Sequence, residues 1–390
     1  MKIYKKFKHI ALLSVVLILT LLLCMVLSVT ADVSNDDVVS LDVRVVDDHP
    51  GVPGFNTEYT FLVYGNTKYN TSLLDTSKYT LSCNNANIVI EDNKVTIPAS
   101  YKDNTDIQVA KIYATLKENT EIKSEYPLMI KNWEITLQDD FNGTELNSDV
   151  WRLCKSWKMG DIGGGKTVAA SSEAYEVKDG KLVLRLIDAN GGTTETKNGV
   201  IVSPDYFNAA VETKNLFTQH YGLFEASIKM PDTGSGGVNT AFWLLPSAGD
   251  WGKTFFAHQR SGTLKGYYCG EIDIVEYSPQ WGKKYQATDH WWSGVSIGHT
   301  DNGKRFQYDK IGSDYVSFAA AWTPNGIYYY CDGKLVKSVK SIDTCEDDAY
   351  MLFTMGSAGY GQQNATWAGW FDDSLLDTLV SYVDYVKIYK

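Results

Sequence analysis

Three carboxylates stand within six residues of this chain, in the segment 270–277, whose sequence is GEIDIVEY. Glu271, Asp273 and Glu276 alternate with β-branched apolar residues, a composition that predicts a strand. Side chains alternate faces along a strand, so Glu271 and Asp273 point the same way and Glu276 would point the other way. A β-bulge at Ile274 and Val275 would bring Glu276 back beside the other two.

Acids crowded on one sheet face repel one another and stabilise nothing, so this cluster points to chemistry. Two carboxyl groups about 5–5.5 Å apart hydrolyse a glycosidic bond with retention, one as the nucleophile and the other as the acid/base. The nucleophile must stay ionised while the acid holds its proton, and Asp273 between them can separate the two titrations. Taken alone, the motif is equally compatible with a solvated polar strand face or a calcium-binding cluster.

Residues 1–31 have the organisation of a secretory signal. Four lysines are followed by an apolar run from Ile10 to Val29 and by the small residues that precede a cleavage site at Ala31. We expect cleavage there and a secreted, extracellular protein. The run is also long enough to span a bilayer, so an uncleaved anchor at the cell surface is the alternative.

The charge balance limits the partners of the chain. Its 390 residues carry a net charge of −11, and removing the four lysines of the signal leaves 32 basic and 47 acidic residues. This excess of acid argues against nucleic acid and anionic membrane surfaces and suits a neutral polysaccharide. We expect a monomer that contacts a membrane only through an uncleaved signal.

Cysteines and aromatic residues add two weaker signals. Five cysteines remain after the signal, with no zinc-ligand spacing, and Cys331 and Cys345 either pair across a hairpin or stay as thiols. The chain contains 25 tyrosines, 14 phenylalanines and 11 tryptophans. Aromatic residues favour strands and also line sugar-binding clefts.

Strand-like segments separated by polar turns fill both parts of the chain. Residues 32–132 predict a small immunoglobulin-like β-sandwich, acting as a spacer or a binding module, and residues 133–390 predict a single all-β sandwich. We place the boundary within 126–133. The turn pairs Asp179-Gly180 and Asp332-Gly333 predict tight hairpins. The predicted strands are 38–46, 59–64, 79–82, 88–90, 94–97, 110–116, 175–187, 209–213, 222–230, 241–245, 271–277, 316–322, 327–331 and 383–389.

The second part also contains a series of landmarks whose order and spacing are shared with a known family. They are DDFNGTEL at 139–146, DGKLVL at 179–184, YGLFEASIKMP at 221–231, AFWLLP at 241–246, WTPNGI at 322–327 and VDYVKIY at 383–389. With the acid cluster, residues 134–390 resemble glycoside hydrolase family 16. The resemblance implies a concanavalin-like β-jelly roll of two curved sheets and retaining hydrolysis of internal β-linked glucan or galactan bonds.

The resemblance assigns roles to the acids and a class to the substrate. It implies that Glu271 is the nucleophile and Glu276 the acid/base. The form Glu-x-Asp-x-x-Glu resembles the bulged branch, which includes laminarinases, agarases and carrageenases, and favours a β-1,3 or mixed β-1,3/1,4-glucan. A galactan-cleaving member is the alternative within the family, and a non-catalytic lectin on the same fold is the alternative from another class.

Further substrate-binding candidates follow from the same resemblance. His290 lies where the family carries a histidine beside the cleaved sugar, and Trp243 lies at a cleft-wall position, with Trp292 as a weaker second wall. Alternation places Ala241 and Trp243 on one face. Asn239 is a candidate because it stands where glucanase-type members often carry Trp-Pro.

The resemblance implies no cofactor for catalysis but a structural calcium ion. The matching positions are Asp140, the carbonyl of Gly180, and Asp384 in the closing strand. Oxygen ligands of this kind suit calcium. Asp384 has the alternative of capping the chain locally or forming a salt bridge.

One motif competes with this interpretation. The sequence GDIGGGKT at 160–167 matches the P-loop pattern, in which backbone amides cradle phosphates. A P-loop lies between a strand and a helix of a parallel α/β sheet, whereas the residues that follow here lead into another strand. We therefore expect a flexible glycine-rich loop and no nucleotide.

Overall fold

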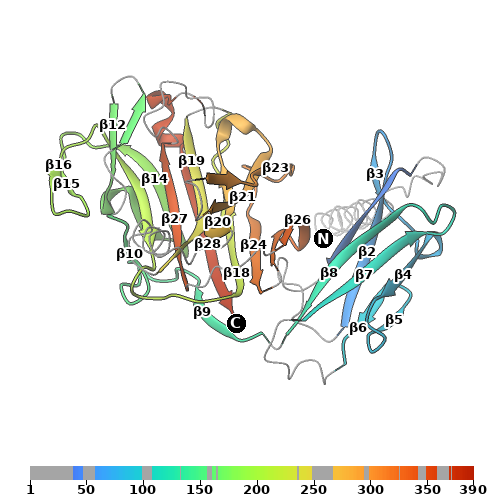
Figure 1. The fold of residues 1–390 in the computed structure, drawn as a ribbon. Coiled ribbons are helices and arrows are strands. Elements are labelled where there is room, and N and C mark those ends of the chain that lie inside the picture. The colour runs from blue at the N-terminus through green and yellow to red at the C-terminus, as the bar shows by residue number, and fades with distance from the viewer. Residues whose placement is uncertain are drawn as a thin grey trace, which may run out of the picture. The chain divides into compact units, whose positions relative to one another are not determined.

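The computed structural model describes residues 38–46, 58–98, 108–131, 133–155, 160–163, 166–234, 237–247, 267–293, 298–324, 326–340, 348–357, 369 and 371–390. The predicted signal, 1–31, lies outside them. The regular secondary structure of the described residues is almost entirely β-strand (Figure 1), and none of their helices is long and apolar enough to cross a membrane. The chain divides into two compact units, with the second beginning its main span at Ile130.

The first unit has two sheets. Phe61 of one sheet meets Tyr126 of the other edge to face, with ring centroids 5.4 Å apart, so its core lies between them. The six predicted strands are confirmed. Two further strands, Thr71–Leu73 and Lys123–Ile130, were not predicted, and the second of them runs into the predicted boundary 126–133. The immunoglobulin-like topology stays a prediction. One sheet holds β1 (Ser40–Val46), β2 (Glu58–Asn66), β3 (Thr71–Leu73), β5 (Val89–Glu91) and β6 (Lys94–Thr96), and the other holds β4 (Tyr79–Cys83), β7 (Gln108–Leu116) and β8 (Lys123–Ile130). A short 3-10 turn, η2 (Thr76–Lys78), precedes β4.

The second unit folds into two layers of antiparallel strands, here called the site sheet and the backing sheet. The site sheet runs in the order β10 (Arg152–Leu153), β17 (Tyr206–Glu212), β27 (Ala349–Ser357), β19 (Val238–Pro246), β20 (Tyr267–Tyr277), β21 (Lys284–Ser293), with β22 (Gly298–Asp301) and β23 (Lys304–Gln307) both paired to β21. The backing sheet contains β13 (Tyr175–Lys178), β14 (Lys181–Asp188), β28 (Val380–Tyr389), β9 (Ile135–Asp139), β18 (Gly222–Lys229), β24 (Val316–Thr323), β25 (Gly326–Cys331) and β26 (Lys334–Lys340).

Apolar side chains from alternate positions of both sheets fill the space between the layers. Phe242 and Phe353 of the site sheet stack at 4.6 Å, and Phe224 and Ile388 of the backing sheet are fully buried in the same cluster. Strands β14 and β17 pair and so join the two layers at one edge. This nearly closed two-layer arrangement is the predicted β-jelly roll.

Smaller elements complete the unit. The hairpins at Asp179-Gly180 and Asp332-Gly333 are confirmed, because all four residues have positive φ, as a two-residue turn between antiparallel strands requires. The additional elements are the hairpin β15 (Thr194–Glu195) with β16 (Ile201–Val202), and the 3-10 turns η4 (Ser172–Ala174), η5 (Pro279–Trp281) and η6 (Asp373–Thr378).

The described residues of the glycine-rich segment lie in two strands, where a loop was predicted. Gly160–Gly163 form β11, which pairs antiparallel with β12 (Lys166–Ala170), and β12 pairs parallel with β17. The Thr167 hydroxyl donates to Asp205 at 2.9 Å, and the Lys166 ammonium lies 3.6 Å from the same carboxylate. The motif ends in a strand, where a P-loop needs a helix. Lys166 and Thr167, the side chains that would bind phosphate and magnesium, both contact the carboxylate of Asp205 instead.

Candidate active site

Strand β20 carries the three predicted carboxylates in the middle of the site sheet. Glu276 pairs with Ala241 of β19 and Asp273 pairs with Trp243, so Ile274 is the extra residue between them. The same slip occurs against β21, where Asp273 pairs with Thr288 and Glu276 with Gln286. The irregularity lies where the spacing of the acids predicts a bulge, and it puts Asp273 and Glu276 on one face.

The opposite face of β20 anchors the strand. Ile272, Ile274, Val275 and Tyr277 all belong to the core between the layers and are nearly inaccessible to water. Two consecutive residues, Ile274 and Val275, therefore point inward, which the bulge permits. The apolar residues fix the strand, and the strand then has no freedom to turn its acids away from the outer surface of the site sheet.

Glu271, Asp273 and His290 form one end of the acid cluster. His290 stands opposite Glu271 on β21, and its Nε2 lies 3.1 Å from Asp273 Oδ2 and 3.7 Å from Glu271 Oε1. The side chain of Asp273 is only 4% exposed, whereas those of Glu271 and His290 are each 22% exposed. Asp273 is thus the buried member, and a substrate can reach the other two.

Glu276 forms the other end, where two neighbouring side chains of β21 hold it. The Thr288 hydroxyl donates to Glu276 Oε2 at 3.0 Å, and Gln286 Nε2 donates to the same oxygen at 3.3 Å. Gly303 lets Gln286 and Thr288 take these positions, because a Cβ at Gly303 would lie 3.1 Å from Gln286 Nε2. Glu276 is therefore oriented from one side and partly exposed on the other.

The surroundings raise the pKa of every acid in the cluster. Burial, with repulsion from Asp273, holds the pKa of Glu271 well above its usual range. Burial, with repulsion from Glu276, does the same to the pKa of Asp273. Burial also raises the pKa of Glu276, although the hydrogen bond from Thr288 acts against it. Because the three acids repel one another, they do not ionise independently, and the cluster is suited to supply both a carboxylate and a carboxylic acid.

The structure places two further substrate-binding candidates on the same face. Ala241 and Trp243 lie together there, as alternation predicted, while Phe242 and Leu244 enter the core. Trp243 is 8% exposed, and its indole donates to Thr354 Oγ1 at 3.2 Å. Asn239 is on this face as well and hydrogen-bonds Glu276.

The predictions for Trp292 and for the pair Cys331 and Cys345 fall partly outside the described residues. The backbone of Trp292 pairs with Tyr268 and His299, and its side chain lies outside the described part of the structure. Cys331 is a buried thiol, and Cys345 falls in a segment that is not described, so their pairing stays untested.

The three residues predicted to bind calcium are engaged with protein side chains. The Lys181 ammonium pairs with Asp384 Oδ1 at 2.7 Å and donates to the Gly180 carbonyl at 3.1 Å. Asp140 Oδ2 accepts from Gln138 at 2.8 Å. As these groups lie they do not fit a calcium ion, and binding of one would have to displace Lys181.

One other cluster among the described residues could hold a metal. The ligand atoms of Glu271, Asp273 and His290 lie within 4.8 Å of one another. These are the acids of the candidate site itself, and the geometry that gathers them serves proton sharing as well as it would serve a cation.

A family model for glycosyl hydrolases family 16 matches residues 168–372, more than half of the chain. The chain belongs to glycosyl hydrolases family 16. Relatives include an endo-1,3-1,4-beta-glycanase, ExsH, of Rhizobium meliloti, 26% identical over 277 residues that cover 65% of this chain and 51% of the relative. A beta-glucanase of Rhodothermus marinus is 22% identical over 278 residues, covering 66% of this chain and 86% of the relative. The chain thus spans about half the length of the first of these relatives.

Solved structures of the family support the fold. A non-specific endo-beta-1,3(4)-glucanase, SCLam, aligns with a TM-score of 0.51 and 19% identity, covering 66% of this chain and 91% of its own. A point mutant of SCLam, crystallised with a gluco-oligosaccharide, aligns with a TM-score of 0.52 and 18% identity, covering 66% and 95%. At these identities the match establishes the jelly roll of the second unit.

Sequence reasoning missed three residues that shape the site. Thr288 and Gln286 orient Glu276, and Gly303 makes room for them. The signal was present in part, because residues two and four positions before His290 on a strand share its face. Gly303 could not have been found this way, since its role depends on which strand packs against β21.

Proposed function

We propose that the chain is a secreted, endo-acting, retaining glycosidase that hydrolyses internal β-1,3 or mixed β-1,3/1,4 linkages of a β-glucan by double displacement. The observation that carries the proposal is the placement of Glu271, Asp273 and Glu276 together on one outward face of the site sheet. The relatives named as an endo-1,3-1,4-beta-glycanase and as a beta-glucanase support the substrate class.

The two displacement steps use the two partly exposed acids. In the first, the Glu271 carboxylate attacks the anomeric carbon, and Glu276 gives its proton to the departing glycosidic oxygen. A glycosyl ester on Glu271 results. In the second, Glu276 removes a proton from water, the water oxygen attacks the same carbon, and Glu271 leaves as a carboxylate. Asp273 is hydrogen-bonded to Glu271, and this bond holds the nucleophile in position.

The test is the release of reducing ends from a panel of polysaccharides, with sizing of the products. Laminarin and lichenan are expected to be cut to oligosaccharides, with β products appearing first by NMR, because two inversions retain configuration. Initial α products would refute retention, and release of single sugars from the start would refute endo action.

A galactan-cleaving enzyme is the second candidate, and Asn239 favours it. The family resemblance places a Trp-Pro pair at this point in glucanase-type members, whereas here an amide hydrogen-bonds Glu276. Agarose, carrageenan and arabinogalactan in the same panel decide between the two. A lectin would bind these polymers and release no reducing ends.

Secretion rests on the amino-terminal sequence. We propose cleavage after Ala31, and the expected result is a protein in the culture medium whose first residue is Asp32. Retention of the intact amino terminus in the membrane fraction would show an anchor instead.

A further inference from the structure

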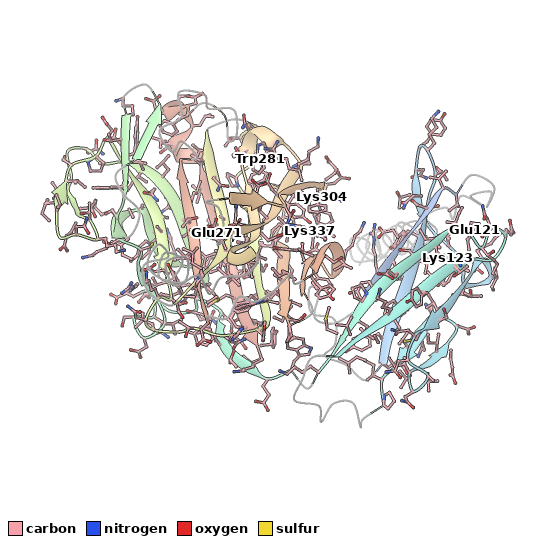
Figure 2. All side chains as sticks on the ribbon, in the orientation of Figure 1. Glu121, Lys123, Glu271, Trp281, Lys304 and Lys337 are labelled. Carbon is pink, nitrogen blue, oxygen red and sulfur yellow. The ribbon has the colours of Figure 1, made fainter. Side chains whose placement is uncertain are left out.

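The turn that follows the catalytic strand presents a tryptophan whose position is fixed. Strand β20 ends at Tyr277, and Pro279–Trp281 form η5 before β21 begins at Lys284. The Tyr277 hydroxyl donates to the Gly282 carbonyl at 3.1 Å, and Lys283 Nζ donates to the Ile311 carbonyl at 2.7 Å. These contacts tie both sides of the turn that carries Trp281 (labelled in Figure 2).

An arginine covers the ring of this tryptophan. Arg305 of β23 stands directly opposite Gln286 of β21, so the two side chains leave the sheet on the same face. Its guanidinium carbon lies 4.0 Å from the centroid of the Trp281 ring. Glu276, Gln286, Arg305 and Trp281 therefore form one continuous row, from the acid/base outward.

The row has the chemistry of a sugar site. Trp281 is partly exposed and Arg305 is exposed, and within the described residues no carboxylate lies within ion-pair distance of Arg305. An aromatic ring offers an apolar face to the C–H groups of a pyranose, and a guanidinium offers a planar set of donors to its hydroxyl oxygens. An arginine held over a tryptophan loses little freedom when it binds.

We propose that Trp281 and Arg305 bind the sugar unit on the leaving-group side of the cleaved bond. This inference rests on the proposed function, because Glu276 protonates the departing oxygen and so marks the side on which the leaving sugar lies. The row beyond Glu276 is then the first surface that this sugar meets. The substrate class it fits is a neutral β-linked chain with at least one unit beyond the cleavage point.

The experiment compares two substrates with the same β-1,3-linked glucosyl units but different leaving groups. One is laminarin, and the other is a β-1,3-gluco-oligosaccharyl fluoride, whose leaving group is a fluoride ion with no sugar. Hydrolysis of laminarin by the wild type tests the proposed function separately. For Trp281→Ala, kcat/KM on laminarin is expected to fall about tenfold, with the fluoride hydrolysed at the wild-type rate. Arg305→Ala is expected to show the same selectivity with a smaller loss.

Two further variants separate binding from folding. Lys304 (labelled in Figure 2) is the neighbouring residue of β23, and alternation places it on the opposite face from Arg305. Lys304→Ala removes the same charge as Arg305→Ala and should leave the hydrolysis of both substrates unaffected. Trp281→Phe keeps an aromatic face and should restore most of the laminarin activity. Equal losses on both substrates, or no loss on laminarin, would overturn the inference.

Discussion

Lys337 and Asp289 form an ion pair that crosses the core beneath the acid cluster. Lys337 comes from β26 of the backing sheet, and its ammonium lies 2.5 Å from Asp289 Oδ1 of β21, with side-chain exposures of 8% and 0%. The ammonium also donates to the Ala287 carbonyl at 3.2 Å, and Asn302 donates to the second oxygen of Asp289 at 2.8 Å. Both charges are buried, and each is the opposite charge nearest to the other.

Replacing one partner leaves a buried charge without compensation, which costs about 3–5 kcal/mol. Lys337→Met keeps the length of the side chain and removes only the ammonium, so we expect the free energy of unfolding to fall by that amount. Asp289→Asn should cost a similar amount. The double variant leaves no buried charge, and its loss should be several kcal/mol smaller than the sum of the single losses.

Urea unfolding followed by tryptophan fluorescence measures these values in the relevant unit alone. All 11 tryptophans lie at or after Trp133, so their emission reports on the second unit. Lys304→Met, an exposed lysine, is the matched control and should change the free energy by less than about 0.5 kcal/mol. A Lys337→Met protein within about 1 kcal/mol of the wild type, or a double variant whose loss equals the sum, would refute the reasoning.

Two further predictions concern the acid/base and calcium. Thr288→Val removes a hydrogen bond that stabilises ionised Glu276, so the pKa of Glu276 should rise further. Because activity requires the protonated acid, the alkaline limb of the kcat/KM profile should move to higher pH, and a shift to lower pH would contradict the assignment. Chelation with EDTA should leave the melting temperature unchanged, because Lys181 already bridges Asp384 and Gly180, and a marked loss that added calcium restores would show that the ion binds.

The parts of the fold that sequence predicted are those with a strong local signal. The β-branched segment around Asp273 and the two Asp-Gly turn pairs each specify their conformation within a few residues. Strand β27 was missed because its sequence, AYMLFTMGS, is apolar on both faces, and periodicity alone does not separate such a run from a buried helix. Strand β27 lies between β17 and β19 in the site sheet, and its side chains on both faces of the sheet are buried.

The parts of the site that could not be predicted depend on pairing between distant segments. The acids were found because all three lie on one strand. Nothing in the local sequence around Asp289 indicates that its carboxylate is buried. It is fully buried, and its ion-pair partner Lys337 lies 48 residues away on the backing sheet. Similarly, the lysine that takes the predicted calcium oxygens is next to Gly180 in sequence, but its pairing with Asp384 exists only once β14 and β28 are adjacent.

The division of roles between Glu271 and Glu276 is tested most directly by azide rescue. The substrate is an aryl β-glycoside, a gluco-oligosaccharide with an aryl leaving group at its reducing end. In Glu271→Ala, azide takes the place of the nucleophile, and one inversion should give the α-glycosyl azide. In Glu276→Ala, the glycosyl ester still forms and azide replaces water in the second step, so two inversions should give the β-glycosyl azide. The opposite pair of products, or full hydrolysis by Glu271→Ala without azide, would contradict the account.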